Sequence, residues 1–173
     1  MIRAAFFLSF LCSAMMLCGQ SSFPKDFIGH WEGELVWYRT AQAKPQKTKM
    51  QLIIRPADTL GQYTWQIIYG EKNEDNRPYL MKPVDSAGIH WIVDERNGIL
   101  LDQYWVGNRV TSTFKVQNIT ILDSYHREGK KLIAEFYMYS SLPIATTGGD
   151  KETPPVDSYE TKAYQRAVMK RKR

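Results

Sequence analysis

The chain has 173 residues and a formal net charge of +5, with 13% aromatic and 24% charged residues. This length suits one domain with a sizeable core. Once Arg3 and the basic residues 170–173 are set aside, 18 basic residues face 18 acidic ones. The body therefore lacks the basic excess that follows nucleic-acid phosphates, and no nucleic-acid partner is expected. Residues 170–173 are predicted to form a basic C-terminal tail.

The first 19 residues resemble a secretory signal peptide. Arg3 supplies the positive start, Ala4 to Leu17 is almost wholly apolar, and small Gly19 ends the segment. The apolar run is shorter than the about 20 residues that span a bilayer. We therefore favour a cleaved signal over a retained anchor, and predict an exported protein, periplasmic or secreted, with no transmembrane segment in the mature chain.

Both cysteines, Cys12 and Cys18, lie inside this leader. The mature chain is therefore expected to have no disulfide and no cysteine metal site. Cys18 ends the apolar run and is a candidate for a lipid anchor. Bulky Leu17 directly before it disfavours that alternative, because lipoprotein signals usually carry a small residue there.

The first predicted strand covers residues 27–38. Successive side chains of a strand point to opposite faces, and here one set is apolar while the other is mostly polar. The small residues beside Trp31 leave room for its ring. The apolar set is Gly29, Trp31, Gly33, Leu35 and Trp37, and the other is His30, Glu32, Glu34, Val36 and Tyr38.

Nine further strands follow in the alternating pattern. Asn97-Gly98 and Gly107-Asn108 predict tight turns between apolar runs. Prolines bound residues 79–82, which predicts a short or edge strand, and residues 156–169 also tolerate a helix. Residues 140–155 form the one long irregular segment. The nine strands are residues 49–55, 62–70, 79–82, 89–94, 99–106, 109–116, 119–126, 132–138 and 156–169.

Short strands with short links predict an all-β fold, a single antiparallel up-and-down β-barrel of about ten strands over residues 20–169. An even number allows the last strand to pair antiparallel with the first. If the first strand starts at a closed end, the loops at residues 40–47, 71–78, 96–98, 117–118 and 140–155 lie at the open end, and the last of these suits a mobile flap.

Gly29-x-Trp31 at the start of the first strand resembles the motif of the lipocalin and calycin superfamily. Ten strands are more similar to its fatty-acid-binding and nitrobindin-like branches than to the eight-stranded lipocalins. The resemblance implies that Trp31 packs at the closed end under a basic residue of the last strand. Arg166 is the nearest candidate and Lys170 the second. The family also implies a small apolar ligand inside the barrel.

Few residues of the sequence indicate a metal, cofactor or catalytic site. His30, His90 and His126 alternate with apolar neighbours and are expected to face outward, so neither a metal site nor a haem or other cofactor is predicted. No catalytic constellation stands out, and we do not expect an enzyme. Asp123 shares the inward parity of Ile121 and Tyr125. It is either a buried carboxylate with a raised pKa or one hydrogen-bonded to a tyrosine or the backbone.

Two hypotheses follow for function. The favoured one is an exported lipocalin-like barrel that binds a small apolar or amphipathic ligand at its mouth and interior. The alternative is a filled barrel that acts as an interaction module of the cell envelope, with Tyr38, Tyr104, Tyr137 and Tyr139 as contact surface. The predicted ligand-binding residues are Trp37, Met50, Tyr69, Val93, Ile99, Phe114, Phe136 and Tyr159; those of the closed end are Gly29, Trp31 and Arg166.

Overall fold

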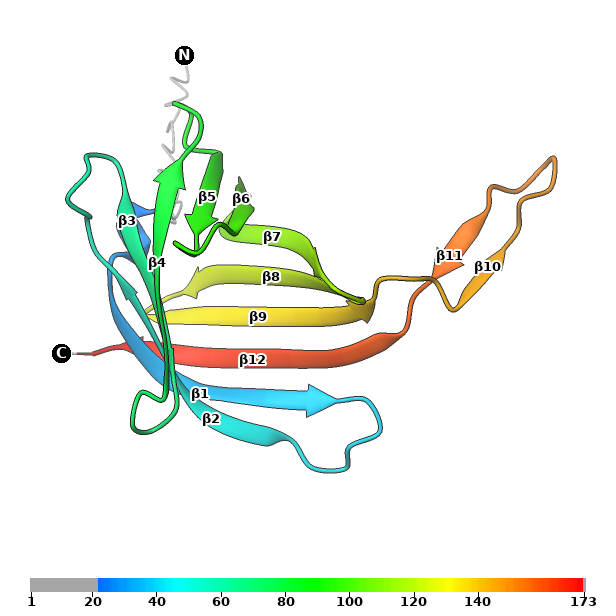
Figure 1. The fold of residues 1–173 in the computed structure, drawn as a ribbon, viewed down its shortest axis with the longest axis horizontal. Coiled ribbons are helices and arrows are strands. Elements are labelled where there is room, and N and C mark those ends of the chain that lie inside the picture. The colour runs from blue at the N-terminus through cyan, green and yellow to red at the C-terminus, as the bar shows by residue number, and fades with distance from the viewer. Residues whose placement is uncertain (1–21, 173) are drawn as a thin grey trace, which may run out of the picture.

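The computed structural model describes residues 22–172, so the predicted signal peptide at residues 1–19, with Cys12 and Cys18, lies outside the described part. The fold is all-β (Figure 1). Its strands are β1 Gly29–Arg39, β2 Gln46–Ile54, β3 Tyr63–Tyr69, β4 Asp75–Pro83, β5 His90–Asp94, β6 Leu100–Val106, β7 Arg109–Val116, β8 Ile119–Glu128, β9 Lys131–Ser140, β10 Ala145–Thr147, β11 Val156–Ser158 and β12 Thr161–Arg171.

Ten of these strands close into one antiparallel barrel, which confirms the predicted strand number. β1 to β9 are neighbours in chain order, and β12 closes the sheet between β9 and β1. Trp31 lies opposite Arg171 in the β1–β12 ladder, and Gly33 lies opposite Met169. Gly33 is needed here for close approach, because a Cβ would lie 2.2 Å from the carbonyl oxygen of Val168 on β12.

Two strands differ from the sequence prediction. β4 is a nine-residue strand that pairs with both β3 and β5, rather than a short or edge strand. Pro78 is accommodated because the residues on either side of it keep the ladder to β3 in register. Residues 156–169 form strands, as predicted, but are divided between β11 and β12. β12 continues through Arg171, so Lys170 and Arg171 belong to the barrel rather than to a tail.

Residues 140–155, predicted to be irregular, contain β10, one strand of a two-stranded ribbon. β10 pairs with β11, and Thr146 lies opposite Asp157. The ribbon projects away from the barrel (Figure 1), and every residue of both strands is exposed. The loop between them begins with Gly148 and Gly149, which both take positive φ angles. Gly148 is needed for close approach, because a Cβ there would lie 2.4 Å from the carbonyl oxygen of Pro154.

The barrel is closed at the end where β1 begins. A short 3₁₀ helix, η1 Lys25–Phe27, places Phe27 fully buried across that end. The Trp31 ring N–H donates to the Phe27 carbonyl oxygen at 2.7 Å. Phe23 packs edge-on against Trp91 with ring centroids 5.1 Å apart. These contacts form a continuous apolar plug.

The basic residue over Trp31 is not Arg166. Arg166 points outward and forms an ion pair with Glu135 at 3.6 Å. The guanidinium carbon of Arg171 instead lies 4.9 Å from the Trp31 ring centroid, and that of Arg127 lies 4.7 Å from it. Arg171 follows Met169 at the inward parity of β12, whereas Arg166 has the outward parity, and this alternation decides which arginine reaches the ring.

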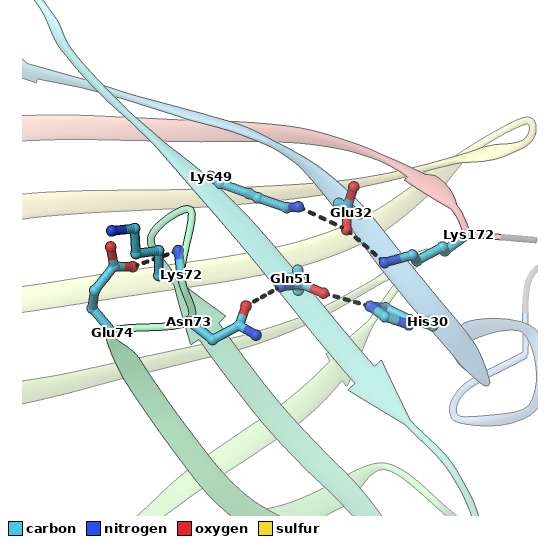
Figure 2. Close-up of polar contacts among 8 residues, drawn as sticks. All are labelled: His30, Glu32, Lys49, Gln51, Lys72, Asn73, Glu74 and Lys172. Atoms are coloured by element: carbon cyan, nitrogen blue, oxygen red, sulfur yellow. Dashed lines mark hydrogen bonds and ion pairs between the residues drawn. The ribbon is translucent and has the colours of Figure 1, made fainter.

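The outer face of β1 and β2 carries a hydrogen-bonded polar network (Figure 2). Gln51, though on the outer face, is only 5% exposed. Its amide N–H donates to Asn73 at 2.8 Å, so its oxygen accepts from His30 Nε2 at 2.7 Å. Glu32 pairs with Lys49 at 3.2 Å and Lys172 at 3.3 Å. Through Asn73, these hydrogen bonds connect the β3–β4 loop to Gln51 on β2, and His30 is hydrogen-bonded to the same side chain.

Candidate ligand-binding cavity

A cavity of about 90 Å³ lies inside the barrel, between the closed-end plug and the open end. Its lining extends from fully buried side chains to Arg77, whose side chain is 43% exposed, so the cavity reaches solvent beside β4. The lining residues are Trp65, Ile67, Tyr69, Arg77, Tyr79, Val93, Glu95, Leu101, Gln103, Phe114, Asp123, Tyr125 and Phe136.

Aromatic rings form much of the wall. Tyr125 on β8 packs edge-on against Trp65, with ring centroids 5.0 Å apart, and against Phe136, with centroids 5.8 Å apart. Edge-to-face packing is a favoured arrangement of aromatic pairs. Trp65 and Tyr125 are each no more than 2% exposed, so neighbouring side chains enclose both rings.

Polar groups lie at the buried end. Gln103 on β6 is 1% exposed and Asp123 on β8 is 6% exposed. The Asp123 Oδ1 and Gln103 Oε1 atoms are buried and have no hydrogen-bond partner within residues 22–172. Buried polar atoms are usually paired, so these two acceptors lack a hydrogen-bond donor that residues 22–172 do not supply. Ser112 Oγ is also unpaired, but Ser112 does not line the cavity.

Burial raises the pKa of Asp123 from 3.8 to about 7, against hydrogen bonds from the Gln103 side chain and the Ser112 backbone that lower it. The carboxyl therefore changes charge near neutral pH. Of the two sequence interpretations, the structure supports the buried carboxylate with a raised pKa. Burial likewise raises the pKa of Tyr69 to about 12, which keeps this phenol neutral.

The solvent end of the cavity carries an ion pair. Arg77 Nε donates to Asp75 Oδ1 at 3.0 Å and Oδ2 at 3.1 Å, and Nη2 donates to Oδ2 at 2.6 Å. Its guanidinium carbon also lies 5.0 Å from the Tyr69 ring centroid. The pair as a whole has little net charge, so Glu95 and Asp123 determine the sign of the field in the cavity.

The structure distributes the eight predicted ligand-binding residues among several places. Tyr69, Val93, Phe114 and Phe136 line the cavity. Trp37 instead lines a shallow depression on β1 and β2, under the guanidinium of Arg39. Met50 is fully buried in the core, and Ile99 and Tyr159 are each 48% exposed.

Of the closed-end residues, Gly29 and Trp31 lie where the sequence placed them. A Cβ at Gly29 would lie 2.9 Å from Arg171 Nε, so its small size accommodates the guanidinium as well as the Trp31 ring.

Sequence reasoning missed Gln103, Tyr79, Arg77 and Glu95. The alternation of side chains along β6 could have indicated that Gln103 faces inward, because it shares that side with Leu101 and Trp105. No such pattern was available for Arg77 and Glu95, because both lie in segments that were predicted to be loops.

The histidines do not form a metal site. His90 Nε2 lies 2.7 Å from Asp102 Oδ1, and His126 Nε2 lies 3.1 Å from Glu128 Oε1. His126 is only 6% exposed, so it is more buried than predicted. Within residues 22–172, no three histidine, cysteine or acidic side chains are grouped closely enough to hold a metal ion. The same part of the chain has no helix long and apolar enough to cross a membrane.

No protein-family model matches the chain, and no curated protein matches it. The solved structures that are similar include that of a protein of unknown function from the DUF3598 family of Nostoc punctiforme PCC 73102. Its TM-score is 0.61 at 15% sequence identity, over 86% of this chain and 48% of that one. This chain thus spans about half the length of that protein. At this identity the likeness supports the barrel fold alone.

Proposed function

We propose that the barrel binds a small amphipathic molecule in its interior cavity. The observation that carries this proposal is the pair of unpaired, buried acceptors on Asp123 and Gln103 beside a wall of aromatic rings. Ligand sites usually combine an apolar, aromatic lining with a few placed polar groups, and this cavity has that composition.

The size of the cavity narrows the ligand. A drug-sized site occupies about 300–1,000 Å³, whereas this cavity has a volume of about 90 Å³. That space holds about three water molecules, or a ligand group of a few heavy atoms. Fatty acids, haem and bilins are therefore disfavoured, and the remainder of a larger ligand would lie at the rim beside Arg77.

A fragment titration tests the proposal. Phenol, indole and short aliphatic alcohols and amines would be added to ¹⁵N-labelled protein, and the amide shifts of the cavity strands recorded. We expect at least one fragment to shift residues of β3, β6 and β8 saturably. Phe114→Trp, which fills the cavity, should abolish these shifts. Thr113→Trp, on the exposed outer face of the same strand, is the matched control. Binding that survives Phe114→Trp, or no saturable shift at all, would overturn the proposal.

The alternative, an envelope interaction module, is favoured by one feature of the outer face. Tyr164 on β12 lies between Tyr38 on β1 and Tyr137 on β9, with ring centroids 6.1 Å and 4.8 Å away. Tyr38 is 49% exposed, and exposed tyrosines are common at protein interfaces. A failed fragment titration would leave this row as the surface to test.

Export is a separate proposal that does not depend on the cavity. Mass spectrometry of protein purified from its own host reports the mature N-terminus and any lipid on Cys18. A mature chain that begins near residue 20 would support export, and an intact Met1 would contradict it.

A further inference from the structure

We propose that the buried end of the cavity binds the ammonium group of a small primary amine, with Asp123 Oδ1 and Gln103 Oε1 as acceptors. This inference rests on the proposed ligand-binding function and specifies the chemical class of the ligand. It starts from the kind of polar atom that is left unpaired, because both are oxygens that accept hydrogen bonds.

The unpaired end of the Gln103 amide is its oxygen. Gln103 Oε1 is buried and has no hydrogen-bond partner within residues 22–172, and the same holds for Asp123 Oδ1. A bound group must therefore supply at least two donors, one for each oxygen, and need present no acceptor. An ammonium group has three N–H donors and no acceptor.

The charges around the cavity favour a cation over an anion. Asp123 forms no ion pair with a cationic side chain of residues 22–172, and an anionic ligand would lie directly beside it. The one cationic side chain of the lining, Arg77, is paired with Asp75. The lining also contains the aromatic rings of Trp65, Tyr125 and Phe136, and aromatic rings attract cations through the partial negative charge on their faces.

Binding of an amine should depend on pH through Asp123. The carboxyl, with its pKa near 7, is neutral at pH 5.5 and mainly ionised at pH 8, while an alkylamine stays cationic at both values. Between these pH values the phenols of Tyr69, Tyr79 and Tyr125 stay neutral and Arg77 stays cationic. Glu95 is the other acidic side chain of the lining.

Three four-carbon probes separate the chemical classes. The dissociation constants of n-butylamine, n-butanol and butyrate would be measured by amide-shift titration at pH 8 and pH 5.5. We expect n-butylamine to bind at least tenfold more tightly than either other probe at pH 8. Its affinity should fall at least tenfold at pH 5.5, while the affinity of n-butanol changes less than threefold.

Variants locate the site. Asp123→Asn keeps the shape of the side chain. At pH 8 it should weaken the binding of n-butylamine at least tenfold and leave the affinity for n-butanol nearly unchanged. Gln103→Leu should weaken the binding of n-butylamine at least threefold. Asp102→Asn makes the same chemical change at a 60% exposed carboxylate on the outer face of β6, and should change neither probe.

Equal affinities for n-butylamine and n-butanol would overturn the ammonium site while leaving the proposed function intact. Amine binding that is unchanged in Asp123→Asn would overturn it as well. Failure of all fragments, neutral ones included, would overturn the proposed function itself.

Discussion

At the closed end of the barrel, the polar groups around Trp31 are paired, whereas in the cavity Asp123 and Gln103 each keep an oxygen without a partner. The Trp31 N–H donates to Phe27, and Arg171 donates to the Ile28 carbonyl oxygen at 2.6 Å. Paired groups in a packed plug stabilise the fold. Unpaired buried acceptors cost stability. The closed end therefore holds the barrel together, while binding is the task that we propose for the cavity.

The largest expected effect is at the plug. Trp31→Ala removes a ring that is 1% exposed, together with its hydrogen bond and the surface on which Arg127 and Arg171 lie. We expect the free energy of unfolding to fall by about 3–5 kcal/mol, measured by urea denaturation. Trp37→Ala, on the same face of β1 but half-buried at the open end, is the comparison and should cost less than about 2 kcal/mol. Similar losses of unfolding free energy in both variants would show that the closed end and the open end contribute equally to stability.

The next effect concerns the buried carboxyl and depends on pH. The pKa of Asp123 in the native state, about 7, exceeds its ordinary 3.8, so the folded protein binds more protons than the unfolded one between these values. Stability should therefore decrease as pH rises from about 4 to 7. Asp123→Asn removes this cost and should stabilise the protein at pH 8 by on the order of 2–4 kcal/mol, with little change at pH 4.

Urea denaturation at the two pH values, without any added amine, measures this difference. Asp58→Asn makes the same chemical change at an exposed residue between β2 and β3, and it is the control that should leave the difference between the two pH values as in the parent. A native state that is equally stable at pH 4 and pH 8, with Asp123→Asn equal to the parent at both, would mean that the carboxylate is already compensated in the folded protein.

The smallest effect is expected at the projecting ribbon. Replacing residues 142–158 by Asn-Gly removes β10 and β11, whose residues are all exposed. It leaves the backbone bond from Ser140 N–H to the Glu160 carbonyl, at 2.9 Å, to hold the ends of β9 and β12. The free energy of unfolding should change by less than about 1 kcal/mol, measured by thermal and urea unfolding. A loss as large as that of Trp31→Ala would show that the ribbon is part of the barrel's support.

Much of the fold could be predicted from local patterning. The alternation of β1, the turns at Asn97-Gly98 and Gly107-Asn108, and the even strand number were enough to predict a ten-stranded barrel, because side-chain parity and turn conformation are local properties. Parity also placed Asp123 inside. The same patterning does not measure strand length, so β4 began earlier and β12 ended later than predicted.

Only the tertiary structure determines which residues come together at the closed end and which come together in the cavity. Arg127 and Arg171 are separated along the chain, and β-barrel closure brings both over Trp31. Gln103 and Asp123 lie on strands with β7 between them, so the unpaired oxygens and the net charge of the cavity depend on side-chain packing across three strands. Alternation along one strand determines the face of a residue, while register between strands determines its neighbours.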